Sequence, residues 1–278
     1  MYINRKICGV WVGDKHPVRI MGVLNLGPES FYKGSIVTTE AATVERAKEM
    51  VIEGAEFLDL GAMSTAPGVN NISEDEELSK LLPVLKAVLD AVDVPISVDT
   101  FRPNVANEAL NIGANIINDV SGFKHDKNMV KILADHDTPS VIMATNRVIG
   151  DPLTVPEIIK SLQESLDLTK KFDYDRGKVI VDPAIGRWVP EKTYQYNLNI
   201  IKQLSELIQL DCPILVGISR KSFIHEILAR PDPKERLFGS LSATAIAVIN
   251  GAHIVRTHDV AATRDVVRVA ELLKPNNS

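Results

Sequence analysis

The stretch Pro213–Ile218, PILVGI, contains no polar side chain and runs directly into the polar residues 219–222, SRKS. A strand that is apolar throughout, rather than at alternate positions, is typical of a parallel sheet covered on both faces. Similar short runs recur along the chain. They are Val18–Leu24, Glu56–Leu60, Pro95–Val98, Asn115–Asn118, Pro139–Met143, Lys178–Val181 and Ala252–Arg256. Together these runs predict eight buried parallel strands.

Longer amphipathic segments separate the predicted strands and favour helices. We expect helices over Thr39–Glu53, Asp75–Ala91, Asn104–Leu110, Val155–Lys171, Leu198–Leu207 and Leu241–Asn250. Two of these segments begin with a capping-box pattern, in which a hydroxyl residue precedes a glutamate by three positions. Ser73 precedes Glu76 in this way, and Thr154 precedes Glu157, with Pro156 acceptable in the first helical turn.

The alternation of strands and helices predicts an α/β fold, namely a (β/α)8 TIM barrel that forms one domain over residues 1–278. An open doubly wound sheet also alternates in this way. However, the chain has neither the G-x-G-x-x-G nor the G-x-x-x-x-G-K-[ST] pattern of the nucleotide-binding versions of that fold. We expect residues 1–17 to form a hairpin-like extension, with Cys8–Val12 as a short β-like run that closes the N-terminal end of the barrel.

The composition narrows the possible partners. The net charge of the 278-residue chain is −5, and no basic stretch resembles a nucleic-acid footprint. Its two cysteines, Cys8 and Cys212, lie far apart, and this favours reduced thiols over a single disulfide. Met1–Lys6 lacks the apolar run of a signal peptide, and no segment is long and apolar enough to span a bilayer. We therefore expect a cytoplasmic protein that binds neither nucleic acid nor membrane.

Polar residues follow seven of the eight predicted strands, and in a (β/α) barrel these positions converge on the C-terminal face, where active sites lie. They are Asn25, Asp59, Asp99, Thr100, Asn118, Asp119, Asp182, Ser219–Ser222 and Arg256–Asp259. For Thr100, Asp119 and Asp259 taken singly, a turn or helix-cap role is the preferred interpretation. A barrel that served only a structural purpose would not direct the whole set to one point, so the pattern predicts a site.

The residue types in this set suggest two kinds of ligand. Asp99, Asn118, Asp182 and Lys221 offer the acceptors and donors that suit a flat heterocycle such as a pterin or a purine. The first and last strands, which carry Asn25 and Arg256–His258, become neighbours when a barrel closes. An arginine and a histidine at that place suit a phosphate or pyrophosphate. Asn25 can also bind a bridging Mg²⁺ through its carbonyl oxygen. For Arg256 an ion pair with Asp259 or Asp59 is the structural alternative.

Seven motifs at these positions resemble those of the dihydropteroate synthase family. They are residues 20–31 IMGVLNLGPESF, 59–68 DLGAMSTAPG, 97–100 SVDT, 117–122 INDVSG, 181–183 VDP, 217–223 GISRKSF and 256–260 RTHDV. Each motif alone is weak evidence. Because all seven occur in order over nearly the whole chain, the resemblance is specific.

The resemblance implies that 6-hydroxymethyl-7,8-dihydropterin pyrophosphate condenses with an aryl amine, usually p-aminobenzoate, and releases pyrophosphate, in folate or methanopterin-type biosynthesis. It also implies Mg²⁺ and a homodimer. The implied residue roles are as follows: pterin binding by Asp99, Asn118, Met143, Asp182 and Lys221; pyrophosphate binding by Asn25, Arg256 and His258; aryl-amine binding by Thr65, Pro67 and Ser222. Of these, Lys221, Asp182, Asn25, Arg256 and His258 would carry the catalysis, and Asn25 would bind the metal.

The departures from the family pattern lie in the loops. Ala66 stands where the family has arginine, Ala144 where it has histidine, and Arg187 where it has an apolar residue; Gly27 and Glu29 alter the first loop. Since Ala66 cannot replace a charge-assisted contact, we expect an altered second substrate, with Arg187 or Arg147 supplying the charge. Two other functions stay open: a pterin-dependent methyltransferase that acts on a corrinoid protein, and a non-catalytic pterin-binding protein.

Overall fold

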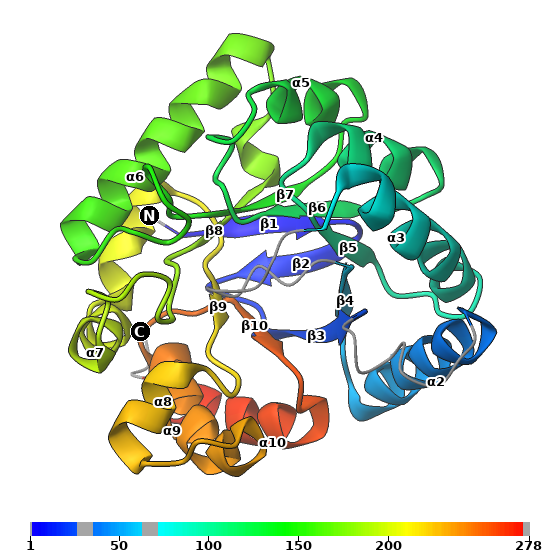
Figure 1. Cartoon of the computed structure of the whole chain (residues 1–278). Helices are drawn as coiled ribbons and strands as arrows, with labels where there is room; N and C mark the ends of the chain where they lie inside the picture. The colour runs from blue at the N-terminus through cyan, green and yellow to red at the C-terminus, as the bar shows by residue number, and fades with distance from the viewer. Residues whose placement is uncertain (1, 27–35, 63–71, 275–278) are drawn as a thin grey trace.

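The computed structural model describes residues 2–26, 36–62 and 72–274, and its central feature is an eight-stranded parallel sheet (Figure 1). The strands are β3 (Arg19–Asn25), β4 (Phe57–Gly61), β5 (Ile96–Asp99), β6 (Ile116–Asp119), β7 (Ser140–Met143), β8 (Val179–Asp182), β9 (Leu215–Gly217) and β10 (Ile254–Thr257). Their order is β8-β7-β6-β5-β4-β3-β10-β9, and a parallel bridge between Val181 and Ile214 joins the two ends. The predicted (β/α)8 barrel is thus confirmed.

Helices surround the strands, as Figure 1 shows. They are α2 (Ile36–Glu53), α3 (Glu74–Leu89), α4 (Pro103–Asn111), α5 (Asn128–Asp135), α6 (Val155–Thr169), α7 (Tyr194–Lys202), α8 (Ser222–Leu228), α9 (Leu237–Ile249) and α10 (Val260–Leu272). The capping box of α6 is complete, and in it Glu157 accepts from the Thr154 N–H at 3.1 Å. At α3 the Ser73 hydroxyl accepts from the Glu76 N–H at 3.2 Å, which is one half of the predicted box. None of the helices in the described part of the chain is long and apolar enough to cross a membrane.

One predicted helix differs from the structure. The prediction of a single helix over Leu198–Leu207 was wrong, because α7 ends at Lys202 and a separate 3-10 segment follows over Leu204–Leu210. Its apolar residues Leu204, Leu207 and Leu210 are buried and recur every third position, which is the period of a 3-10 helix. A spacing of three also occurs in α-helices, so the sequence pattern did not separate the two.

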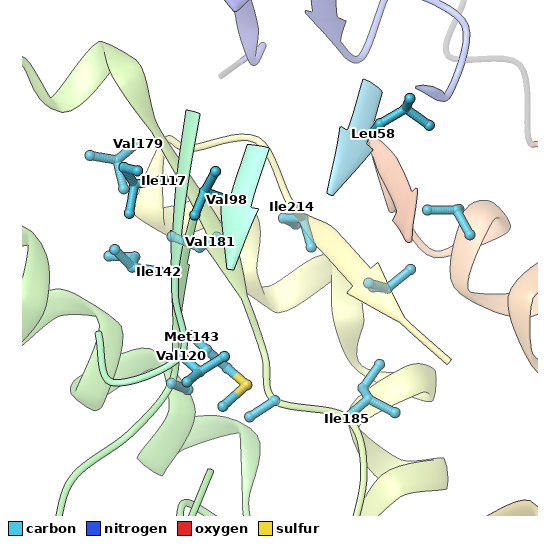
Figure 2. Close-up of a cluster of buried hydrophobic side chains, with 14 of the residues drawn as sticks. Leu58, Val98, Ile117, Val120, Ile142, Met143, Val179, Val181, Ile185 and Ile214 are labelled. Carbon is cyan, nitrogen blue, oxygen red and sulfur yellow. The ribbon is translucent and has the colours of Figure 1, made fainter. Parts of the chain in front are cut away.

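Alternation along the strands divides the apolar side chains into two layers. Ile117, Ile142 and Val181 belong to the large cluster that packs between strands and helices, part of which Figure 2 shows. The residues that precede them in the chain, Ile116, Val141 and Ile180, belong to a second cluster instead. The other members of this second cluster are Ile7, Val12, Met21, Phe57, Leu215 and Ile254. Because successive side chains of a strand face opposite ways, this second cluster fills the inside of the barrel near the strand starts.

An N-terminal hairpin supplies the first two residues of the inner cluster. β1 (Asn4–Ile7) pairs antiparallel with β2 (Val10–Gly13) through a two-residue turn in which Cys8 and Gly9 both have positive φ, 45° and 87°. Ile7 and Val12 are fully buried. In Figure 1 the hairpin lies across the middle of the ring of strands. The hairpin therefore covers the N-terminal end of the barrel and leaves the opposite end for the polar residues.

Replacing Ile7 with alanine tests this packing. Deleting a fully buried aliphatic side chain leaves a cavity, so Ile7→Ala is expected to lower the free energy of unfolding by about 2–4 kcal/mol. Urea denaturation followed by circular dichroism measures the change. Lys6→Ala, at an exposed position on the other face of the hairpin, is the control and is expected to cost under about 1 kcal/mol. An equal, small effect for both variants would show that the hairpin does not form part of the core.

Candidate active site

The polar residues at the strand ends lie side by side at the C-terminal end of the barrel. Asp99 of β5 pairs in register with Asn118 of β6, and Met143 of β7 pairs with Asp182 of β8. Asn118 lies two residues beyond Ile116, and Asp182 two beyond Ile180, so both continue the inward-facing rows of the inner cluster. The structure thus brings four of the five residues predicted for the pterin pocket onto adjacent strands of one barrel.

The Arg256 guanidinium connects two buried carboxylates. Its Nε donates to Asp59 Oδ2 at 2.6 Å and its Nη2 donates to Asp99 Oδ2 at 3.1 Å. Asn118 Nδ2 also donates to Asp59 Oδ2, at 3.1 Å. Of the two ion pairs considered from the sequence, the one with Asp59 is present. The pair with Asp259 is not, because that carboxylate binds Arg220 at 2.8 and 2.5 Å.

Two carboxylate oxygens of this network lack a partner. Asp59 Oδ1 and Asp99 Oδ1 are buried and accept no hydrogen bond from the described residues. Burial, and then the neighbouring Asp59 carboxylate, raise the pKa of Asp99 to about 7. A buried acceptor without a donor costs free energy, and a ligand N–H that reached Asp99 Oδ1 would remove that cost. The Asp99–Asn118 edge therefore has the chemistry of a heterocycle-binding site.

Asp182 and Lys221 form the opposite side of the pocket. Asp182 Oδ1 accepts from the Ala184 N–H at 2.7 Å, and burial raises the pKa of this carboxyl. The Lys221 ammonium donates to the Ile185 carbonyl. Burial lowers the pKa of Lys221 to about 8, although the negative charge of Asp182 acts in the opposite direction and raises it. A carboxylate and an ammonium therefore act on each other in a buried environment, where charges interact more strongly than in water.

Asn25 and His258 lie together at the junction of β3 and β10. Asn25 Nδ2 is 3.4 Å from His258 Nε2, and His258 Nδ1 is 3.2 Å from the Ser219 hydroxyl. Burial, and then the Arg256 charge, lower the pKa of His258 to about 4, so the imidazole is neutral near pH 7. An amide donor at Nε2 favours the tautomer with its proton on Nδ1. His258 therefore offers this site hydrogen bonds rather than a positive charge while no anion is bound.

Two cavities open near these residues. One, of about 350 Å³, is lined by Asn25 and His258 together with Arg46 of α2, whose Nη2 donates to the His258 carbonyl at 3.2 Å. The other, of about 500 Å³, lies over the ends of β5, β6 and β7 and is lined by basic residues that include Lys124 and Arg147. Sequence reasoning did not identify Arg46, which lies inside a predicted helix and far from every strand end.

The structure does not bring the residues predicted to bind the aryl amine together into one site within the described part of the chain. Thr65 and Pro67, like the altered positions Gly27, Glu29 and Ala66, lie outside the described residues. Ser222 is exposed at the start of α8. Arg187 is 45% exposed and pairs with Glu226 of α8 at 2.9 Å, so it binds a substrate only if it leaves that ion pair. Sequence reasoning missed its neighbour Trp188, whose ring lies 5.1 Å from the Lys221 ammonium.

Two strand-end residues have structural roles: Asp119 has the turn role preferred from the sequence, whereas the Asp259 side chain does not cap α10. Asp119 accepts the N–H groups of Ser121 and Phe123, at 2.7 and 3.0 Å, and so shapes the turn after β6. Asp259 binds Arg220. Within the described residues, no group of three His, Cys, Asp or Glu side chains has an arrangement that could hold a metal ion.

The fold and the site together define a class: a (β/α)8 barrel protein with buried acidic and amide side chains at the C-terminal end of the barrel and a cavity beside Asn25 and His258. A family model described as "Pterin binding enzyme" matches residues 21–258. The dihydropteroate synthase of Synechocystis is 37% identical over 264 residues, which cover 91% of this chain and 89% of the relative. The chain belongs to the pterin-binding enzymes and, within them, to the dihydropteroate synthase family of transferases.

Solved structures agree with this assignment. Dihydropteroate synthase from Xanthomonas albilineans with 4-aminobenzoic acid has a TM-score of 0.86, 32% identity and coverage of 98% of both chains. The enzyme from Coxiella burnetii in complex with pteroic acid has a TM-score of 0.83 and 32% identity, with 99% of each chain covered. The likeness extends over the whole fold rather than over the barrel strands alone.

The pH dependence of stability tests the burial of Asp99. A carboxyl whose pKa is raised on folding binds more protons in the native state, so its contribution to stability falls as the pH rises from about 4 to about 7. Asp99→Asn is expected to remove this contribution. The difference in unfolding free energy between the parent and the variant then changes across that window and is constant above about pH 8. A difference that does not depend on pH, measured by urea titration from pH 4.5 to 8.5, would contradict the assignment.

Proposed function

We propose that the protein condenses 6-hydroxymethyl-7,8-dihydropterin pyrophosphate with an aryl amine, p-aminobenzoate or a variant of it, and releases pyrophosphate. The observation that carries this proposal is the buried, unpartnered Asp99 Oδ1 at the barrel end, beside Asn118 and opposite Asp182 and Lys221. This arrangement suits the N–H-rich edge of a pterin. Membership of the dihydropteroate synthase family supports the same substrate class.

The reaction needs no protein nucleophile. The bond between the pterin methylene carbon and the pyrophosphate oxygen breaks, and its electron pair leaves with pyrophosphate. The amine nitrogen then forms the new bond to that carbon and releases one proton. The enzyme's contribution is to align the two reactants and to stabilise the separated charges. Asp182, buried beside the ring, would stabilise the developing pterin cation, and Lys221 would bind an acceptor atom of the same ring.

Asn25, His258 and Arg256 would act on the pyrophosphate. The Arg256 guanidinium already bridges Asp59 and Asp99, so in the proposed complex it links the pterin edge to the leaving group. His258 would donate a hydrogen bond to a pyrophosphate oxygen from Nε2, with the proton of the neutral ring moved there from Nδ1. Arg46 borders the same cavity, but its charge is already paired with Glu49 and Glu53.

The residues near Asn25 fit a magnesium ion that is held mainly by the substrate. Mg²⁺ keeps several waters and usually takes only one or two protein ligands in addition to phosphate oxygens. With Nδ2 directed at His258, Asn25 Oδ1 is the oxygen that would bind the ion. When bound, the ion would neutralise charge on the leaving pyrophosphate.

We further propose one domain over residues 1–278, a cytoplasmic location and a homodimer. The free thiols of Cys8 and Cys212 support a reducing compartment. The dimer is supported by α9, which is apolar on almost every side and exposes Phe238, at 80%, and Ile246, at 47%, two turns apart on one face.

The dimer proposal gives a direct test. A charge placed in an apolar interface is costly to bury, so Phe238→Glu is expected to shift the protein from dimer to monomer in sedimentation equilibrium. Leu272→Glu, at an equally exposed position of α10, is the control and is expected to leave the dimer intact. A monomeric parent protein would exclude the proposal.

Pyrophosphate release tests the activity itself. The protein is incubated with the pterin pyrophosphate, Mg²⁺ and a panel of aryl amines, and release with p-aminobenzoate or with another amine of the panel is expected. Asp182→Asn is expected to lower kcat by roughly 100-fold, because it removes a buried negative charge that favours the cation. Asp135→Asn, an exposed aspartate at the end of α5, is the matched control. Binding of the pterin without release of pyrophosphate would overturn the proposal in favour of a non-catalytic pterin-binding protein.

A further inference from the structure

A basic cavity lies over the ends of β5, β6 and β7, apart from the residues assigned to the pterin. Its volume is about 500 Å³, and its described lining includes Arg102, Lys124 and Arg147 but no aspartate or glutamate. It shares no lining residue with the cavity beside Asn25 and His258. In a chain whose net charge is −5, a cavity with this lining suits an anionic ligand.

Hydrogen bonds fix the wall of this cavity that the loop after β7 forms. The Thr145 hydroxyl donates to the Val120 carbonyl at 2.8 Å, which ties the loop to the one after β6. The Asp151 carboxylate accepts the N–H groups of Asn146 and Arg147, at 2.7 and 3.1 Å. The backbone that carries Arg147 is therefore held in place before a ligand binds.

The far end of the same loop is fixed at Gly150. Its N–H donates to the Thr145 hydroxyl at 3.0 Å, and its carbonyl accepts from the buried Lys192 ammonium at 3.0 Å. Gly150 has a φ of +69°, and a Cβ there would lie 2.2 Å from Trp188 Cγ. Glycine is therefore required at this position for conformation and for space, and the loop has little freedom to collapse into the cavity.

Lys124, from the loop after β6, adds a positive charge to the cavity. Its ammonium donates to the Ser161 hydroxyl and carbonyl at 3.0 and 3.2 Å, and it lies 3.3 Å from the Glu164 carboxylate and 3.4 Å from Asn146 Oδ1. Three N–H groups thus serve four acceptors, so the longest contact is replaceable. Burial lowers the pKa of Lys124, and an anion beside it would stabilise the charged form.

The two arginines of the cavity differ in their partners. Arg102 is occupied, because its Nη1 donates to the Glu77 carboxylate at 2.5 Å and its Nη2 to the Ile72 carbonyl at 2.6 Å. Arg147 bonds to the described residues through its backbone N–H alone, and its guanidinium has no partner among them. A guanidinium has five N–H donors in a planar fork that matches a phosphate group. Arg147 therefore offers the cavity a full set of donors.

Apolar side chains line another part of the cavity. Phe101 and Ile149 both border it. The Phe101 ring meets the His125 ring edge-on, with 4.6 Å between the ring centres, so the plane of the phenyl ring is defined. An anionic ligand that reaches Arg147 can therefore pack an organic group against this side.

We propose that this cavity binds the phosphate group of a small molecule that is neither substrate of the proposed reaction. Arg147 donates to the phosphate oxygens, Lys124 adds a second positive charge, and Phe101 and Ile149 contact the organic part. No residue of the predicted pterin pocket lines the cavity, and the pyrophosphate is assigned to the other cavity. The site does not depend on the synthase reaction, so a binding measurement tests it separately from the proposed function.

Calorimetric titration with phenyl phosphate tests the site. The titrations use the His258→Ala background, which weakens anion binding in the other cavity. Arg147→Ala is expected to weaken phenyl phosphate binding about tenfold, because it removes charge-assisted hydrogen bonds. Lys124→Met is expected to weaken it about threefold, the effect of a partly exposed charge. Arg268→Ala on α10 and Lys127→Met before α5 change exposed residues of the same types and are the matched controls.

Two further ligands identify the bound group. Inorganic phosphate is expected to bind about fivefold more weakly than phenyl phosphate, because it has no ring to pack against Phe101. Equal affinities that both depend on Arg147 would support the site and identify free phosphate as its ligand. Benzoate carries a single charge and is expected to bind about tenfold more weakly. Benzoate that binds as tightly as phenyl phosphate would overturn the assignment to phosphate.

Two results would overturn the proposal as a whole. The first is that phenyl phosphate does not bind, or that its affinity is unchanged in an Arg147→Ala variant that circular dichroism shows to be folded. The second is displacement of phenyl phosphate by p-aminobenzoate, because it would assign Arg147 to the second substrate. A protein that binds phenyl phosphate through Arg147 but releases no pyrophosphate with any amine would overturn the proposed function and leave this site standing.

Discussion

Closure of eight parallel strands into one barrel is the constraint on which the rest of the structure depends. Because side chains alternate along a strand, each strand presents one row to the helices and another to the barrel interior. The lower part of the inner row is apolar and is covered by Ile7 and Val12 of the hairpin. The upper part carries Asn118 and Asp182, so the strand pattern that builds the core also sets the position of the site.

Burying several charged side chains at the end of the barrel costs electrostatic free energy. Asp59 and Asp99 are both buried, and a single guanidinium, that of Arg256, lies between them. One positive charge does not offset two buried carboxylates, and this agrees with the raised pKa of Asp99 and with the two carboxylate oxygens that lack donors. A ligand with several N–H groups relieves this cost on binding, and the unliganded pocket is therefore suited to the pterin edge.

The strands and their polar ends were predictable from sequence because both follow from short apolar runs of fixed length. The ranges of α5, α8 and α10 were not predicted; α5 and α8, with eight and seven residues, have too few turns for a clear period. The contacts of Arg256, the cavity position of Arg46 and the packing of Trp188 on Gly150 join segments far apart in the chain, and no local pattern encodes them. Arg187 and Trp188 are adjacent, and only the conformation of the loop shows which of them contacts Lys221.

The central claim is that the pterin binds inside the barrel end, against Asp99 and Asn118. A crystal structure of the protein in complex with 7,8-dihydropteroate tests it most directly. The account predicts that an N–H of the pterin ring lies about 2.7–3.2 Å from Asp99 Oδ1, with Asn118, Asp182 and Lys221 around the same ring. A pterin bound elsewhere, for example in the cavity lined by Lys124 and Arg147, with Asp99 Oδ1 still without a partner, would contradict it.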